Sequence, residues 1–290
     1  MQLDIFNDSR DVMLRNDVLS ALQQYDAAGA RRALQALANE YPDDVAQLYF
    51  GSIVNAVEGR STVPFDRHEA ALQARQALSH VVQPAVARVF PGRTGATWLA
   101  PLWAELAGRA AALPFLSTHA DAHAAPLFLL AARWLEASDS ISRIASWRRI
   151  PAPLCWMTEA RYRLDGLDAA WPLLVELAWL SPFRFDRLLS RLDDACVNRL
   201  RRAFDTSFDG QGDIGDLAWF PAWVLTEKAG LAPLFKRAEP SRRNAPERAA
   251  KVVLELLSLE RQGRHHELLE TRRELQALNA ALYAAYMKTR

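Results

Sequence analysis

Apolar residues recur at helical spacing along almost the whole chain, and this pattern constrains the fold more than any other feature. Leu19, Leu22, Leu34 and Leu37 are spaced to lie on one helical face, and the turn-forming segment Asp26–Gly29 divides them into two stretches. No segment shows the sustained apolar–polar alternation of a half-buried strand, and β-branched residues are sparse. The sequence therefore predicts an all-α protein built from antiparallel helical hairpins.

Proline and glycine residues mark the expected ends of these helices. Pro42, Pro182 and Pro246 each stand at the start of a new apolar-periodic stretch, where the first turn of a helix tolerates proline. Gly166 and Gly263 separate two such stretches in the same way. The expected helices span residues 10–25, 30–40, 43–58, 66–80, 96–111, 125–137, 153–164, 168–180, 184–204, 216–229, 246–261 and 265–286.

Two sets of residues recur at fixed offsets and indicate an internal duplication. Residues at an offset of 140 match in identity: Ala30, Leu34, Leu37, Ala38 and Pro42 recur as Ala170, Leu174, Leu177, Ala178 and Pro182. A second set at an offset of 120 relates Pro101, Trp103, Phe115, Ala125 and Pro126 to Pro221, Trp223, Phe235, Ala245 and Pro246. We expect two divergent helical halves, residues 1–138 and 139–290, within one continuous unit. A shared hairpin pattern without true duplication is the alternative.

The spacing of the first set resembles the second helix and terminal proline of a tetratricopeptide repeat, over residues 30–42 and 170–182. This resemblance implies hairpins stacked as an α-α solenoid or two-layer array, with a concave surface that binds peptides. The Trp, Leu-Gly and Tyr series of the first helix in that family is missing from residues 14–25 and 154–164. Its absence puts the peptide groove in doubt.

Charge and cysteine content exclude several functional classes. The chain carries 35 Lys and Arg residues against 34 Asp and Glu residues, so no overall field favours direct nucleic-acid binding. Its two cysteines are too few for a disulfide framework. The apolar runs are too short to cross a bilayer, and the first eight residues lack the features of a signal peptide. We expect a cytoplasmic protein with no membrane contact.

Two segments resemble metal sites without completing them. His119 and His123 are one helical turn apart, as in a zincin helix, but Ala120 occupies the position of the required glutamate. We therefore expect these histidines to serve as loop or capping residues. The segment Asp209–Asp216 resembles a calcium loop but lacks its turn glycine and bidentate glutamate, so we expect a flexible linker with Asp216 capping the next helix. The sequence predicts no metal and no cofactor.

A basic segment offers a candidate phosphate contact. Arg143, Arg148 and Arg149 surround Trp147, and Asp139 is their only acidic neighbour in the sequence. Arginine fits phosphate oxygens with two parallel hydrogen bonds. The segment is thus a candidate for binding a phosphate group.

The N-terminal residues carry a sharper hypothesis. Gln2, Leu3, Asp4, Ile5 and Phe6 resemble the pentapeptide with which bacterial replication and repair proteins bind the sliding clamp, with Ile5 in place of leucine as the single departure. An extended peptide can place Leu3, Ile5 and Phe6 in apolar pockets while Gln2 makes directional hydrogen bonds. In the alternative interpretation, the same apolar side chains pin the N-terminus to the protein's own core.

These observations favour a non-catalytic protein that binds another macromolecule, with a clamp-associated accessory factor in DNA replication or repair as the specific hypothesis. The nine tryptophans fall mostly in apolar-periodic stretches, so we expect them in the core rather than in a base-stacking surface. The chain has no phosphate-binding glycine loop and no Gly-x-Ser-x-Gly motif. The alternative is an enzyme of unknown class whose site is assembled from distant helices.

Overall fold

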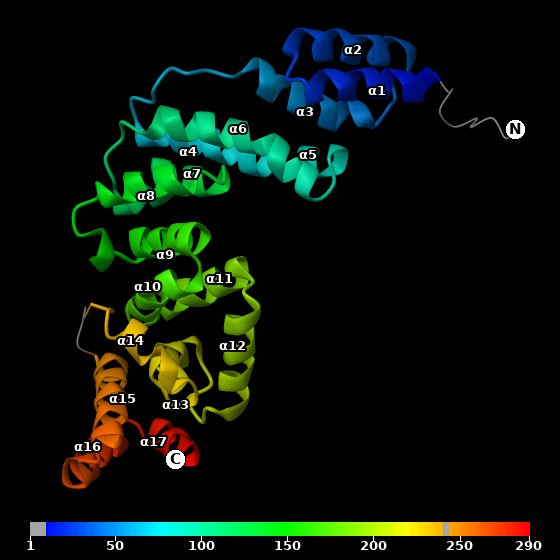
Figure 1. Cartoon of the computed structure of the whole chain (residues 1–290). Coiled ribbons are helices and arrows are strands. Elements are labelled where there is room, and N and C mark those ends of the chain that lie inside the picture. Colours follow the sequence, from blue (N-terminus) through cyan, green and yellow to red (C-terminus); the bar gives the residue numbers. More distant parts are fainter. Residues whose placement is uncertain (1–9, 240–243) are drawn as a thin grey trace, which may run out of the picture. The chain divides into compact units, whose positions relative to one another are not determined.

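The computed structural model describes residues 10–239 and 244–290 (Figure 1). Within these ranges every regular element is a helix and no strand occurs, which confirms the all-α prediction. The chain divides into two compact units, Met1–Ser140 and Ile141–Arg290, which we call the N-terminal and C-terminal units. Among the described helices, none has the length and apolarity needed to cross a bilayer.

The N-terminal unit contains seven α-helices within its described residues, and an eighth crosses its boundary. In chain order these are α1 (Arg10–Gln23), α2 (Ala27–Glu40), α3 (Ala46–Glu58), α4 (His68–Ala77), α5 (Gln83–Val89), α6 (Arg93–Ala110), α7 (Ala124–Leu130) and α8 (Trp134–Ser142). A π-helical turn, η1 (Leu78–Val82), joins α4 to α5, and a 3₁₀ helix, η2 (Ser117–Ala122), precedes α7.

The C-terminal unit continues in the same all-helical manner. Its α-helices are α9 (Pro151–Asp165), α10 (Leu167–Leu180), α11 (Pro182–Leu192), α12 (Ala195–Ser207), α13 (Phe220–Glu227), α14 (Ala232–Phe235), α15 (Ala245–Gln262), α16 (His265–Leu278) and α17 (Ala280–Lys288). Short 3₁₀ helices stand between them: η3 (Trp147–Arg149), η4 (Ile214–Ala218) and η5 (Ala229–Leu231).

Helices α1 and α2 form the first hairpin, and they pack along their lengths (Figure 1). Asp26 begins α2, because its side chain accepts a hydrogen bond from the Gly29 backbone N–H at 2.9 Å. Leu22 of α1 and Leu37 of α2 are fully buried. The interface therefore uses the apolar face that the sequence spacing predicted.

Helices α9 and α10 form a second hairpin, and α10 has the same length and register as α2. Each helix has 14 residues, and each ends where the backbone N–H of the next residue bonds a leucine carbonyl, that of Leu37 or Leu177. Three of the five positions that match at the offset of 140 are buried in both helices: Ala30, Leu34 and Leu37 in α2, and Ala170, Leu174 and Leu177 in α10. The other two differ, because Ala38 is half-buried and Pro42 is exposed, whereas Ala178 is buried and Pro182 is half-buried.

The residues that match at the offset of 120 do not occupy equivalent local structures. Pro101 stands inside the 18-residue helix α6, whereas Pro221 occupies the first turn of the 8-residue helix α13. Trp103 and Trp223 are both buried, with 3% and 2% of their surface exposed. Burial is thus shared in this region, but the local structure around the two prolines is not.

Three expected helices are each broken in two, the first two at residues that favour a turn or a cap. The expected helix 184–204 stops at Asp193, which adopts a left-handed backbone conformation, and Asp194 then caps α12. The expected helix 265–286 breaks where Asn279 accepts a hydrogen bond from the Leu282 N–H at 2.8 Å. The third, 125–137, breaks near Ala132, whose φ is +56°.

The tryptophans lie mostly in the core, as expected. Trp98, Trp171 and Trp179 are buried, and Trp98 also donates its indole N–H to the Leu22 carbonyl at 2.8 Å. Trp134 and Trp219 differ from the expectation, because both are only half-buried. Trp219 precedes α13 as its N-cap, where a side chain reaches the surface more readily than in mid-helix.

Candidate functional site

The clamp-like segment Gln2–Phe6 lies outside the described residues. The first described helix, α1, begins at Arg10 and buries Leu14, Val18 and Leu22. The clamp-binding hypothesis therefore continues to rest on the sequence.

The candidate phosphate-binding arginines lie in and before η3, where two carboxylates approach from other parts of the chain. Arg148 donates from Nε to Glu176 Oε2 at 2.7 Å and from Nη2 to Glu176 Oε1 at 2.6 Å. Its Nη1 donates to Glu239, and Arg149 lies 3.9 Å from the same carboxylate. Arg143 lies in the turn after α8. The basic segment is thus balanced by acids that are far away in the sequence.

Glu176 is the most deeply placed member of this cluster. Only 2% of its side chain is exposed, and the backbone N–H of Glu239 donates to its Oε1 at 2.7 Å. Burial raises the pKa of Glu176, while the Arg148 guanidinium and the Glu239 N–H act in the opposite direction by stabilising the carboxylate. The three groups join η3, α10 and the segment after α14 into one network.

The two candidate metal-binding histidines have separate roles. His123 accepts a hydrogen bond from the Ala125 N–H at its Nδ1, at 3.2 Å, and so caps α7, which confirms the capping role expected for it. His119 lies in η2, with its Nε2 3.7 Å from Glu69 and its ring beside that of His68. Across the described ranges, no group of three or more metal-ligating side chains is assembled.

We expect the purified protein to hold no stoichiometric zinc at His119 and His123, because a zinc site needs three or four protein ligands in one place. Elemental analysis of protein prepared without chelator checks this expectation. One equivalent of zinc that disappears on His123→Ala would contradict it.

The calcium-like segment is a loop held by its own carboxylates. Asp216 accepts backbone hydrogen bonds from Gln211 at 3.0 Å and from Gly212 at 2.7 Å. Asp213, rather than the predicted Asp216, caps the following helix η4 by accepting from the Gly215 N–H. The sequence prediction that Asp216 is the capping residue was therefore wrong. The Asp216 carboxylate instead turns back and binds the backbone of the loop.

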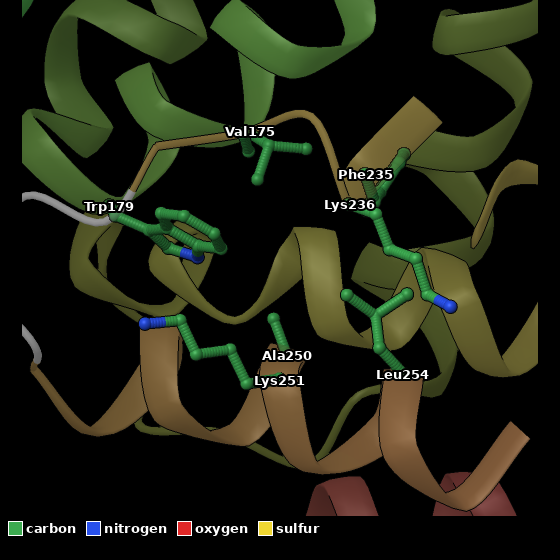
Figure 2. A pocket seen from close by; sticks show the side chains of 8 residues that line it. Val175, Trp179, Phe235, Lys236, Ala250, Lys251 and Leu254 are labelled. Carbon is green, nitrogen blue, oxygen red and sulfur yellow. The ribbon is translucent and has the colours of Figure 1, made fainter. Parts of the chain in front are cut away.

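A pocket of about 150 Å³ lies in the C-terminal unit between α10, α14 and α15 (Figure 2). Helix α10 contributes Val175 and Trp179, and Phe235 ends α14. The aliphatic part of the lining comes from Ala238, Ala250 and Leu254, and two lysines complete it, Lys236 and Lys251. Most of the wall is hydrocarbon, and its polar groups are ammonium groups and one indole.

Local structure explains how the pocket's walls are held. Asn244 caps α15 by accepting from the Glu247 N–H at 3.0 Å, and its amide nitrogen donates to the Trp179 carbonyl at 3.3 Å. This contact fixes the start of α15 beside the end of α10. On the other side, the ring of Phe235 packs against that of Trp171 with centroids 5.3 Å apart.

The polar groups that line the pocket differ in whether they form an ion pair or a hydrogen bond. Lys251 Nζ lies 3.2 Å from Glu247 Oε1, whose side chain is fully buried. Lys236 is exposed, and no hydrogen bond or ion pair joins its ammonium group to another described residue. The Trp179 indole N–H is buried and has no hydrogen-bond partner in the part of the chain that the structure describes. From the sequence we expected Trp179 in the core and gave neither lysine a role, although two of the chain's four lysines line this pocket.

Comparison with known proteins yields no match to a protein-family model, to a curated protein or to a solved structure.

Proposed function

We propose that this chain is a non-catalytic binding protein, in which helical hairpins form the scaffold and Gln2–Phe6 is the recognition peptide for a bacterial sliding clamp. In this proposal the hairpins stack as a tetratricopeptide-like α-α array with two related halves. The protein acts in the cytoplasm as an accessory factor of DNA replication or repair and contacts the clamp rather than the DNA.

The observation that carries the scaffold part is the use of buried carboxylates to tie helices together. Asp44, just before α3, pairs with Arg15 of α1 at 2.8 Å, and only 5% of its side chain is exposed. Glu159 of α9 pairs with Arg191 of α11 at 2.7 Å. Glu176 of α10 holds Arg148 of η3 in the same way. Charges that an active site could use are here engaged in joining one helix to another.

The matched hairpins support the repeat part of the proposal. Helices α2 and α10 share their length, three buried positions at the offset of 140 and the backbone hydrogen bond that closes their last turn, although α10 buries many more residues. Arrays of such hairpins bury a continuous core between neighbours and present long surfaces to partners. This architecture suits recognition of another macromolecule.

The peptide Gln2–Phe6 supplies the partner-specific part. Burial of its three large apolar side chains offers about 1.5–3 kcal/mol each. Ordering a terminus and losing rigid-body freedom offset much of that gain. We therefore expect weak binding, with a dissociation constant of about 1–100 μM.

Titration calorimetry with the purified full-length chain and a purified bacterial sliding clamp tests this proposal. The expected result is binding in that range, with displacement of the chain by a synthetic peptide of residues 1–12. Absence of binding with both proteins at about 100 μM would remove the clamp from the proposal. A native affinity capture that recovers no stoichiometric partner of any kind would remove the binding function as well.

A further inference from the structure

The pocket between α10, α14 and α15 has the size and lining of a site for a small apolar molecule. Its volume is about 150 Å³, and Val175, Phe235, Ala250 and Leu254 supply most of its wall. An apolar cavity of about this volume accepts a molecule the size of benzene. A single aromatic ring or a short branched chain therefore fits the hydrocarbon part of the pocket.

The pocket also holds a hydrogen-bond donor that the described residues do not use. Trp179 is 6% exposed, and within residues 10–239 and 244–290 its indole Nε1 has no hydrogen-bond partner. Figure 2 shows this nitrogen on the ring edge that faces α15. A buried donor without a partner costs free energy, and a ligand atom that accepts its proton removes that cost. The occupant should thus carry an acceptor at this end.

The charge of the lining selects an anion. Lys251 shares its charge with Glu247, but the exposed Lys236 meets no carboxylate among the described residues, so its ammonium group can turn toward a bound anion. A carboxylate has two oxygens, which can accept from the indole N–H and from an ammonium group together. A single carboxylate matches what the pocket offers.

We propose that this pocket binds a small apolar monocarboxylate of about the size of benzoate. Among the described residues that line the pocket, no side chain carries a carboxylate, thiol or hydroxyl group, and the role we assign to the site is binding. This inference concerns the C-terminal unit alone and is independent of clamp binding by Gln2–Phe6.

Titration calorimetry of the full-length chain with benzoate, and with benzyl alcohol as the uncharged analogue, tests the proposal. We expect benzoate to bind with a dissociation constant of about 1 mM, as befits a ligand with so few atoms. Benzyl alcohol should bind about fivefold more weakly, because it loses the charge-assisted contact. Failure of benzoate to bind at about 10 mM would overturn the proposal.

Three variants and one control locate the binding. Lys236→Met should weaken benzoate about fivefold and leave benzyl alcohol unchanged, and Trp179→Phe should weaken benzoate by a similar factor, about fivefold, through loss of the indole N–H. Ala250→Leu should fill the pocket and abolish binding of both molecules. Lys228→Met, an exposed change outside the pocket, should bind like wild type. Circular dichroism melting identifies the folded variants, and wild-type benzoate affinity in folded Lys236→Met and Trp179→Phe would contradict the assigned site.

Discussion

Replacing Arg148 with methionine should lower the free energy of unfolding by about 3 kcal/mol, because it leaves the carboxylate of Glu176 buried without its counter-ion. This loss lies at the lower end of the range for breaking a buried ion pair, about 3–5 kcal/mol, because a quarter of the Arg148 side chain is exposed. Urea denaturation followed by circular dichroism measures the change. Arg149→Met is the matched control and should cost less than about 1 kcal/mol, because 45% of that arginine side chain is exposed to solvent.

A double variant separates the loss of the pair from the loss of packing. Arg148→Met/Glu176→Gln removes both charges, so it should recover most of the stability that Arg148→Met loses. A double variant as unstable as the single one would show that the ion pair is not the source of the effect. In that case the packing of the Arg148 stem would have to explain the loss.

The pH dependence of the single variant follows from the direction of the Glu176 pKa. Burial raises this pKa, so the folded state binds a proton more readily than the unfolded chain, and the contribution of Glu176 to stability falls as pH rises through its folded pKa. Arg148→Met removes a group that lowers the pKa, which should therefore rise further. Its stability deficit against wild type should be largest near neutral pH and should shrink as the pH is lowered to about 5.

Trp223→Ala should cost about 3–5 kcal/mol, since it removes a large side chain from the centre of an aromatic cluster. Trp223 is 2% exposed, and its ring meets that of Phe204 edge-on and lies nearly parallel to that of Phe220. Trp223→Phe should cost less than about 1.5 kcal/mol, because it keeps an aromatic ring and also removes an indole N–H that meets no acceptor among the described residues. Equal losses for the two variants, measured by urea denaturation, would contradict this interpretation of the cluster.

The ends of a helix were predictable from the sequence where the apolar spacing stops at a glycine or a proline. The helix expected at residues 168–180 is observed as Leu167–Leu180, and that expected at 246–261 as Ala245–Gln262. The segment 184–204 shows the opposite case. Its apolar spacing continues without interruption across Asp193 and Asp194, so the period alone cannot reveal that one aspartate ends α11 and the next caps α12.

The surroundings of the candidate sites could not be read from local sequence. Arg148 has one acidic neighbour in the sequence, yet its two partners, Glu176 and Glu239, come from helices and loops further along the chain. The pocket around Trp179 was missed for a related reason. Apolar periodicity shows which helical faces are buried, but only the packing of α10, α14 and α15 shows that those faces leave a space between them.

A Leu3→Ala/Phe6→Ala double variant shows whether Gln2–Phe6 binds a sliding clamp while the helices serve as its scaffold. Buried apolar anchors dominate small interfaces, so this variant should lose clamp binding in titration calorimetry. Its melting temperature should equal that of wild type, because in this proposal Leu3 and Phe6 do not pack in the core. A melting temperature lowered by several degrees, together with no clamp binding by the wild-type chain, would contradict the account and assign Leu3 and Phe6 to the protein's own core.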